Sequence, residues 1–123
     1  MTTKDEFITM KMNEVKNHTN DQSFDMFELI GSIGDLFSSA YQTENIASKL
    51  VINSLWELLL DIFLKTDNHT NRTTVLFVMS DILLYTKKRD IFLNLKPLKD
   101  WQNAHNENST SSEIIECIDD MLL

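Results

Sequence analysis

Apolar residues dominate the middle of the chain, over residues 46–64. The first half of this stretch is one-sided, with Leu50 among the apolar residues at helical spacing, and from Leu55 onward only two acids interrupt the apolar residues. A helix that is apolar nearly all round must be surrounded by other elements, so the pattern predicts the central helix of a globule. The two acids, Glu57 and Asp61, are four residues apart and therefore share one narrow edge that can reach water.

Amphipathic periodicity predicts further helices on both sides of this stretch. The expected helices cover residues 3–17, 24–41, 44–65 and 70–89, and a short last helix follows a polar loop near the end of the sequence. Thr43 is expected to cap the central helix, and Thr110 or Ser112 the last one, because their hydroxyl groups can accept hydrogen bonds from free backbone amides.

The apolar segment 91–95 precedes Pro97, the one proline of the chain. A strand at this position would lack an obvious partner. We therefore expect a short helix that stops before Pro97 and a second one that resumes through Leu98 and Trp101, with the proline in its first turn.

Two glycines, Gly31 and Gly34, lie inside the second predicted helix. Each weakens a helix by about 1 kcal/mol relative to alanine. We expect them to permit the close approach of a neighbouring helix, and a local break of the helix is the competing interpretation.

Composition favours an all-α fold. Two Gly and one Pro are too few for many tight hairpins, and 123 residues fit a single domain, 1–123. We predict a compact bundle of five or six helices around the buried central helix, with an α-solenoid of helical hairpins as the alternative. The tetrapeptide Asn-His-Thr-Asn, at 17–20 and again at 68–71, would suit a duplicated hairpin. The residues after the two copies align poorly, so a chance repeat is preferred.

The chain carries 19 acids against 11 bases, a net charge of −8. Such a surface repels phosphate backbones and anionic lipid, so direct binding of nucleic acid or of a membrane is disfavoured. It attracts a basic protein. The competing interpretation is that acidic charge only keeps a cytoplasmic protein soluble.

Acidic residues follow one side of the second predicted helix and one side of the last, and we expect both sides to contact a partner. The residues concerned are Asp21, Asp25, Glu28 and Asp35 on the first side, and Glu113, Glu116 and Asp120 on the second. Spacings of three, four and seven residues place each set on one exposed face. Trp101, which has polar neighbours, is expected to be partly exposed and to anchor the same partner.

Patterns for catalysis and metal binding are weak. His18, His69 and His105 are expected in loops, and no two of them have the short spacing of a zinc site, so no metal and no other cofactor is predicted. Cys117 lies among apolar residues and is expected to be a buried structural cysteine. The sequence shows no phosphate-binding loop and no hydrolase motif, so an enzyme is not the favoured interpretation.

The segment at the start of the sequence has acids where a signal peptide needs a basic start and an apolar run. A single cysteine excludes a disulfide within the chain. No stretch approaches about 18 uncharged apolar residues, the length that a membrane span needs. A cytoplasmic location is therefore expected.

These observations favour a small acidic protein that binds a basic protein. Our first hypothesis is an immunity protein or antitoxin that neutralises a basic nuclease-type toxin by blocking its active site. The alternative is a phage or mobile-element inhibitor or adaptor of a host nucleic-acid enzyme, and the third hypothesis is a helical enzyme with an unfamiliar site.

Overall fold

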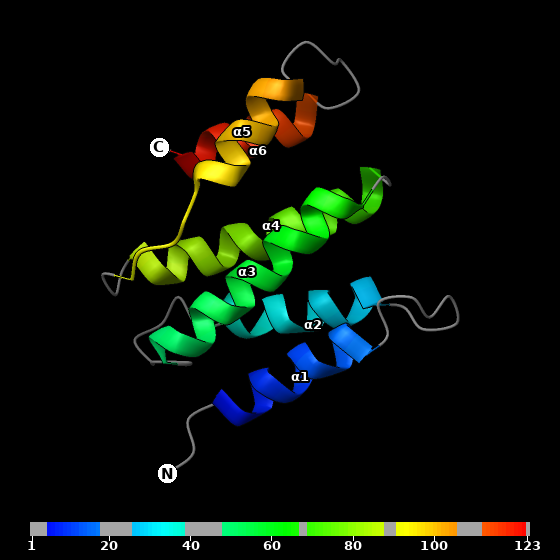
Figure 1. Ribbon diagram of the computed structural model, residues 1–123, viewed down its shortest axis with the longest axis vertical. Helices are drawn as coiled ribbons and strands as arrows, with labels where there is room; N and C mark the ends of the chain where they lie inside the picture. The colour runs from blue at the N-terminus through cyan, green and yellow to red at the C-terminus, as the bar shows by residue number, and fades with distance from the viewer. Residues whose placement is uncertain are drawn as a thin grey trace.

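A computed structural model of the chain describes residues 5–17, 26–38, 48–66, 69–87, 91–105 and 112–122. Within these ranges the chain forms six helices and no strand, which confirms the all-α prediction. The helices are α1 (Asp5–Asn17), α2 (Met26–Ser38), α3 (Lys49–Lys65), α4 (His69–Lys87), α5 (Lys96–His105) and α6 (Ser112–Leu122), shown in Figure 1.

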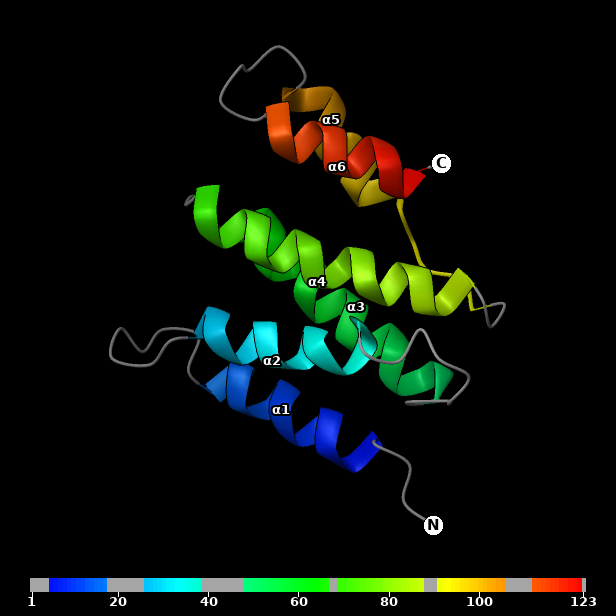
Figure 2. The same cartoon turned by 180° about the vertical axis from the view of Figure 1, so that it is seen from behind.

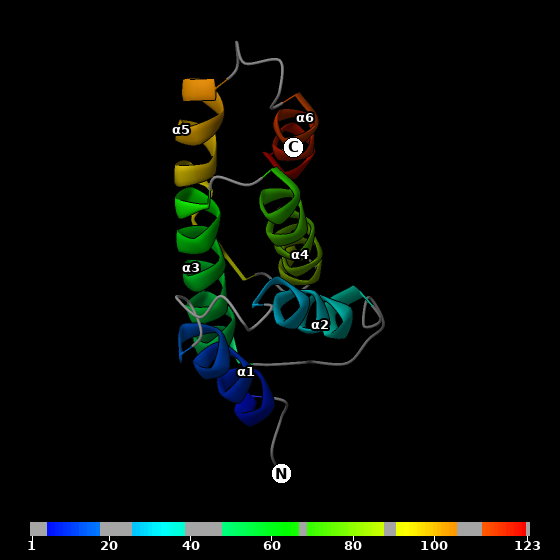
Figure 3. The ribbon, with the colours of Figure 1, turned by 90° about the vertical axis from the view of Figure 1, so that its right-hand side faces the viewer.

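Consecutive helices pair into three hairpins, α1–α2, α3–α4 and α5–α6, and the hairpins stack on one another. Figure 3 shows the result as two layers, with α1, α3 and α5 in one and α2, α4 and α6 in the other. The helices thus pack as a bundle whose order is that of a short α-solenoid, the arrangement that the sequence suggested as the alternative. The first copy of the repeated tetrapeptide begins at Asn17, the last residue of α1, and the second ends at Asn71, in the first turn of α4.

The centre of the molecule is shared by α3 and α4. Helix α3 packs against α1, α4 and α5, and α4 packs against α2, α3 and α6. Seven residues of α3 are buried, as predicted for the central helix: Ile52, Leu55, Trp56, Leu59, Leu60, Ile62 and Phe63. The expectation that α3 is enclosed nearly all round is wrong, because Leu50 is 78% exposed and Leu64 44%. A helix inside a two-layer stack has neighbours on three sides and keeps an outer face.

Helix α3 also begins later than predicted. Ser48 is its N-cap, with extended backbone angles (φ −71°, ψ 160°), and its hydroxyl oxygen accepts a hydrogen bond of 3.3 Å from the amide of Val51. Leu50 consequently lies in the first turn. Thr43, the predicted cap, lies outside the described residues, as do the predicted helical residues before Asp5.

The prediction of a helix over residues 91–95 is wrong, because this segment is extended. Its residues alternate between half-buried and exposed, as in any extended chain that covers a core with one side. The indole nitrogen of the buried Trp56 donates a 3.1 Å hydrogen bond to the carbonyl of Asn94, which ties this segment to α3. The Asn94 side chain accepts from the amide of Lys96 (3.2 Å), where α5 starts, and Pro97 lies in the first turn of α5 as predicted.

Helices α2 and α4 approach closely at Gly34. A Cβ atom at this position would lie 2.8 Å from Cγ2 of Val78, so the prediction of a close helix–helix contact is confirmed here. It is wrong for Gly31, where such an atom would meet nothing within 4 Å. Helix α2 runs without a break through both glycines. Next to this contact, the rings of Phe37 and Tyr85 pack edge to face, with centroids 5.3 Å apart.

Candidate partner-binding surface

The two predicted acidic sides belong to α2 and α6, and the fold brings both helices into one layer. Helix α4 lies between them, as Figure 2 shows from the side of this layer. We call the helices α2, α4 and α6 the acidic layer, because of the charge that they carry together.

Charge is divided unequally between the two layers. The acidic layer has seven acidic residues, two on α2, one on α4 and four on α6, and its two basic residues, Arg72 and Lys87, are both on α4. The helices α1, α3 and α5 carry six acidic and six basic residues. The net negative charge of the described helices therefore lies entirely in the acidic layer.

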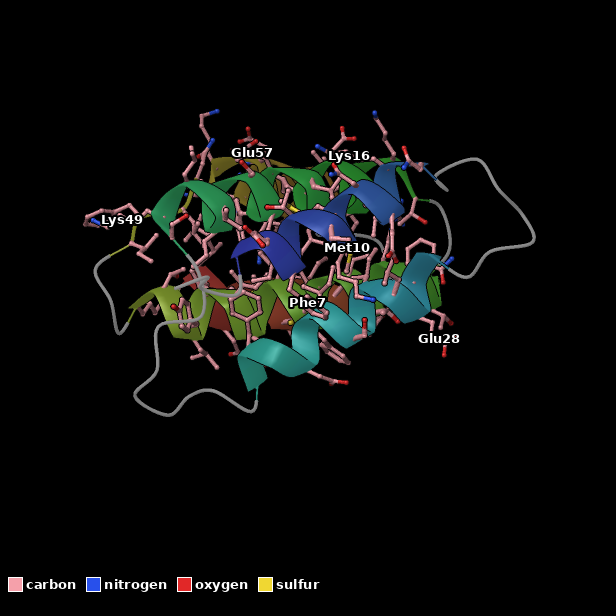
Figure 4. All side chains as sticks on the ribbon, turned by 90° about the horizontal axis from the view of Figure 1, so that it is seen from below. Phe7, Met10, Lys16, Glu28, Lys49 and Glu57 are labelled. Atoms are coloured by element: carbon pink, nitrogen blue, oxygen red, sulfur yellow. The ribbon has the colours of Figure 1, made fainter. Side chains whose placement is uncertain are left out.

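On α2, Glu28 and Asp35 are exposed, as predicted. Figure 4 shows Glu28 on the α2 side of the molecule, and Lys16, Lys49 and Glu57 on the side of α1 and α3. Asp21 and Asp25, the other two predicted contact residues on this side, lie outside the described residues.

Asp81 on α4 was not among the predicted contact residues, and it extends the acidic side of α2 across the layer. Asp35 follows Gly34 and Asp81 lies one turn after Val78, so the contact between Gly34 and Val78 brings the two carboxyl groups near each other. Partial burial raises the pKa of the Asp81 carboxyl, and the charge of Asp35 raises that pKa further. Only the register between α2 and α4 could have revealed this pair.

Two large apolar side chains of α4, Phe77 and Leu84, are also exposed at the surface, by 58% and 57%. They are seven residues apart, on the side of α4 opposite its buried residues, and Asp81 lies one turn from each. We call Phe77 and Leu84 the apolar pair. Their spacing of seven residues was the signal in the sequence, but most residues of α4 from Val75 to Tyr85 are apolar and the pair did not stand out.

On α6, Glu116 and Asp120 are exposed, as predicted, and Glu113 belongs to the same helix. Asp119 faces α5, where its carboxylate accepts a hydrogen bond from the side-chain amide of Gln102. Successive residues of a helix are about 100° apart around its axis. Asp120 therefore points in a different direction from Asp119, whose carboxylate joins α6 to α5.

The predicted exposure of Trp101 is wrong, because its side chain is only 7% exposed. Its ring packs edge to face on Phe63 of α3, with centroids 5.1 Å apart, and the Arg72 guanidinium lies 5.5 Å from the ring centroid. The polar neighbours of Trp101 suggested a surface position, and Lys99 and Asp100 are exposed, but Leu98 and Trp101 are buried on the inner side of α5. Trp101 is a core residue and cannot anchor a partner at the surface.

Groups suited to chemistry do not converge in the described part of the chain. No group of three or more His, Cys, Asp and Glu side chains there could hold a metal ion. His69 and His105 were expected in loops, but they are the first residue of α4 and the last of α5, and His18 is not described. Cys117 is half-buried, and burial, together with the charge of Asp120, raises the pKa of its thiol. A nucleophilic cysteine requires the opposite shift.

An open groove follows the outer side of α1, lined by Glu6, Thr9, Met10, Asn13, Glu14 and Asn17. All of these residues come from one helix, so they do not form a set of groups that converges on a ligand. Among the helices described, none has both the length and the apolar character that a membrane crossing requires. No protein-family model, curated protein or solved structure matches the chain.

Proposed function

We propose that the protein captures a basic protein through its acidic layer. The observation that supports this function is the unequal division of charge, since all of the net negative charge of the described helices lies on α2, α4 and α6. Charge that only served solubility would not need to be concentrated in one layer. Concentrated charge of one sign steers an oppositely charged partner and increases its association rate.

The partner class that we propose is a nuclease-type toxin, with this protein as its immunity protein or antitoxin. A nuclease needs basic side chains to bind the phosphates of its substrate. A rigid layer of carboxylates can bind the same basic side chains of the nuclease. The substrate and this protein then compete for the active-site groove of the nuclease. This step is supported by charge alone, which restricts the chemistry of the partner but not its identity.

The test uses two charge-reversed double variants of the full chain. E28K/E116K reverses one glutamate on α2 and one on α6, and the control E6K/E57K reverses one on α1 and one on α3. The two variants are matched, because all four glutamates are exposed, Glu6 and Glu28 lie near helix starts, and Glu57 and Glu116 lie inside helices. Each variant is used to capture proteins from the source cell, and the captured protein is assayed on a labelled oligonucleotide.

We expect the parent and E6K/E57K to capture a basic nuclease and to inhibit it in competition with the oligonucleotide, whereas E28K/E116K loses both effects. Capture of acidic proteins only would contradict the proposal. So would cleavage of the oligonucleotide by the purified protein itself, or equal losses in the two double variants.

A further inference from the structure

The outer face of α4 has no partner among the described helices, although the rest of α4 is covered. Its inner residues pack in the core, and Val78 and Tyr85 pack on α2. The apolar pair lies on the remaining face. Seven residues correspond to about 10.5 Å along a helix, so a single helix of another protein can contact both side chains.

The other large apolar residues exposed in the described part of the chain lie outside the acidic layer: Phe7 and Met10 on α1, Leu50 and Leu64 on α3, and Phe92 in the segment before α5. Leu50 and Leu64 lie near opposite ends of α3, in the layer where acids and bases are equal in number. On α1, the ammonium group of Lys11 lies 5.3 Å from the ring centroid of Phe7. The apolar pair differs from these in lying within the acidic layer.

Carboxylates lie on α4 beside the apolar pair and on both neighbouring helices of the acidic layer. Asp81 lies on the same side of α4, one turn from each member, and Asp35 is close to Asp81 across the contact with α2. Helix α6, with Glu116 and Asp120, flanks α4 on the side away from α2. An apolar centre with a polar rim is the usual composition of a protein interface.

We propose that the outer face of α4 docks a basic amphipathic helix of the partner protein. The apolar residues of that helix cover Phe77 and Leu84, and its lysines and arginines face the carboxylates of α2, α4 and α6. Such helices bind through apolar residues spaced three, four and seven apart. A second copy of this chain is the poorer occupant, because it would bring two acidic layers together. The proposal rests on the function proposed above, since it identifies the part of the basic partner that is recognised.

The mutational test compares two double variants that each remove two exposed apolar side chains. F77A/L84A removes the apolar pair, and L50A/L64A removes the corresponding residues of α3 as a control. The probe is a synthetic amphipathic helix of leucine and lysine with leucines three, four and seven residues apart, and the second probe is a scrambled peptide of the same composition. Dissociation constants are measured by fluorescence anisotropy, and circular dichroism checks that each variant remains folded.

We expect the parent to bind the amphipathic peptide more tightly than the scrambled one. F77A/L84A should weaken binding by about tenfold or more, because buried apolar anchors carry much of the affinity of an interface. L50A/L64A should remain within about twofold of the parent, which is the effect expected of residues outside the interface. Equal binding of both peptides, or unchanged binding by F77A/L84A, would overturn the proposal. So would a dimer of the parent, seen by light scattering, that F77A/L84A dissociates.

The outcomes separate this inference from the proposed function. If F77A/L84A binds the peptide normally while E28K/E116K still fails to capture a nuclease, only the docking site is wrong. If the peptide binds at the apolar pair but no nuclease is captured, the docking site is supported and the assignment of the partner as a nuclease is wrong.

Discussion

Individual residues were predicted well where one neighbour decides their environment, and poorly where several elements meet. The exposure of Glu57 and Asp61 followed from their spacing alone. The burial of Trp101 did not, because it depends on Phe63 of α3 and Arg72 of α4, which only the folded chain brings to α5. Leu50 was misplaced for a related reason, since the hydroxyl of Ser48 starts the helix and places Leu50 in its first turn.

The two glycines of α2 allow a controlled test of the contact with α4, because only Gly34 lies at that contact. Gly31→Ala should stabilise the protein by about 0.5–1 kcal/mol, because alanine favours a helix and the new methyl group meets no atom. Gly34→Ala gains the same helix preference but forces a methyl group against Val78, a β-branched side chain with little freedom to move. Overpacking costs roughly 1–3 kcal/mol. Urea unfolding should therefore show G34A to be less stable than G31A by at least about 1 kcal/mol, and equal stabilities would exclude the close contact.

The pair of acids on α2 and α4 predicts a pH dependence. The pKa of Asp81 in the folded protein is raised above its ordinary value of 3.8, by burial first and then by the charge of Asp35. The folded state thus holds this proton more tightly than the unfolded chain does, and the favourable contribution to stability is lost as the pH rises through the raised pKa. Asp81→Asn removes the charge, so at pH 7 it should unfold at a higher temperature than the parent.

The difference in unfolding temperature between Asp81→Asn and the parent should become small as the pH falls below 3.8. There the Asp81 carboxyl of the parent is protonated in both the folded and the unfolded state. Glu57→Gln, at an exposed position of α3, is the control and should change the unfolding temperature less. An Asp81→Asn protein that is less stable than the parent at pH 7 would contradict this account of the pair.

At the scale of elements, long periodic stretches gave reliable predictions and short ones did not. The apolar pattern of α3 and α4 is maintained over several turns, and both stretches form helices as predicted. Segment 91–95 offered five residues, too few to distinguish a helix from an extended chain by pattern. In the folded chain this segment is held against α3 by the hydrogen bond that the Trp56 indole donates to the carbonyl of Asn94. That contact spans 38 residues and is not visible in the local sequence.

The role of α3 in the core can be tested at two leucines. Leu59 is fully buried, and Leu59→Ala should lower the free energy of unfolding by about 2–5 kcal/mol, as cavities in a core do. Leu50→Ala, at the exposed end of the same helix, should change it by no more than about 0.5 kcal/mol. Thermal or urea unfolding followed by circular dichroism measures both values. An L59A protein as stable as L50A would show that α3 is not central to the core.

For the whole molecule, the sequence supplied the net charge and the two acidic sides but not their relation to each other. Glu28 and Glu116 come together in one layer because each is on the second helix of a hairpin, and the hairpins stack in order. The order of helices alone could not fix this, because the same six helices could have formed a bundle around one of them. Only this arrangement makes the apolar pair a candidate binding site, because it places Phe77 and Leu84 in the acidic layer. In the sequence they are two among several apolar residues of α4.

The central claim, that the acidic layer captures a basic partner, is tested most directly by the association rate of the captured partner at low and physiological ionic strength. Because charges are screened beyond about 8–10 Å near physiological salt, steering should be strong in dilute buffer and weaker as salt is added. We predict that E28K/E116K associates at least about tenfold more slowly than the parent at low salt, and that E6K/E57K stays within about threefold of it. Equal rates for the two variants, or a parent rate that does not change with salt, would contradict the claim.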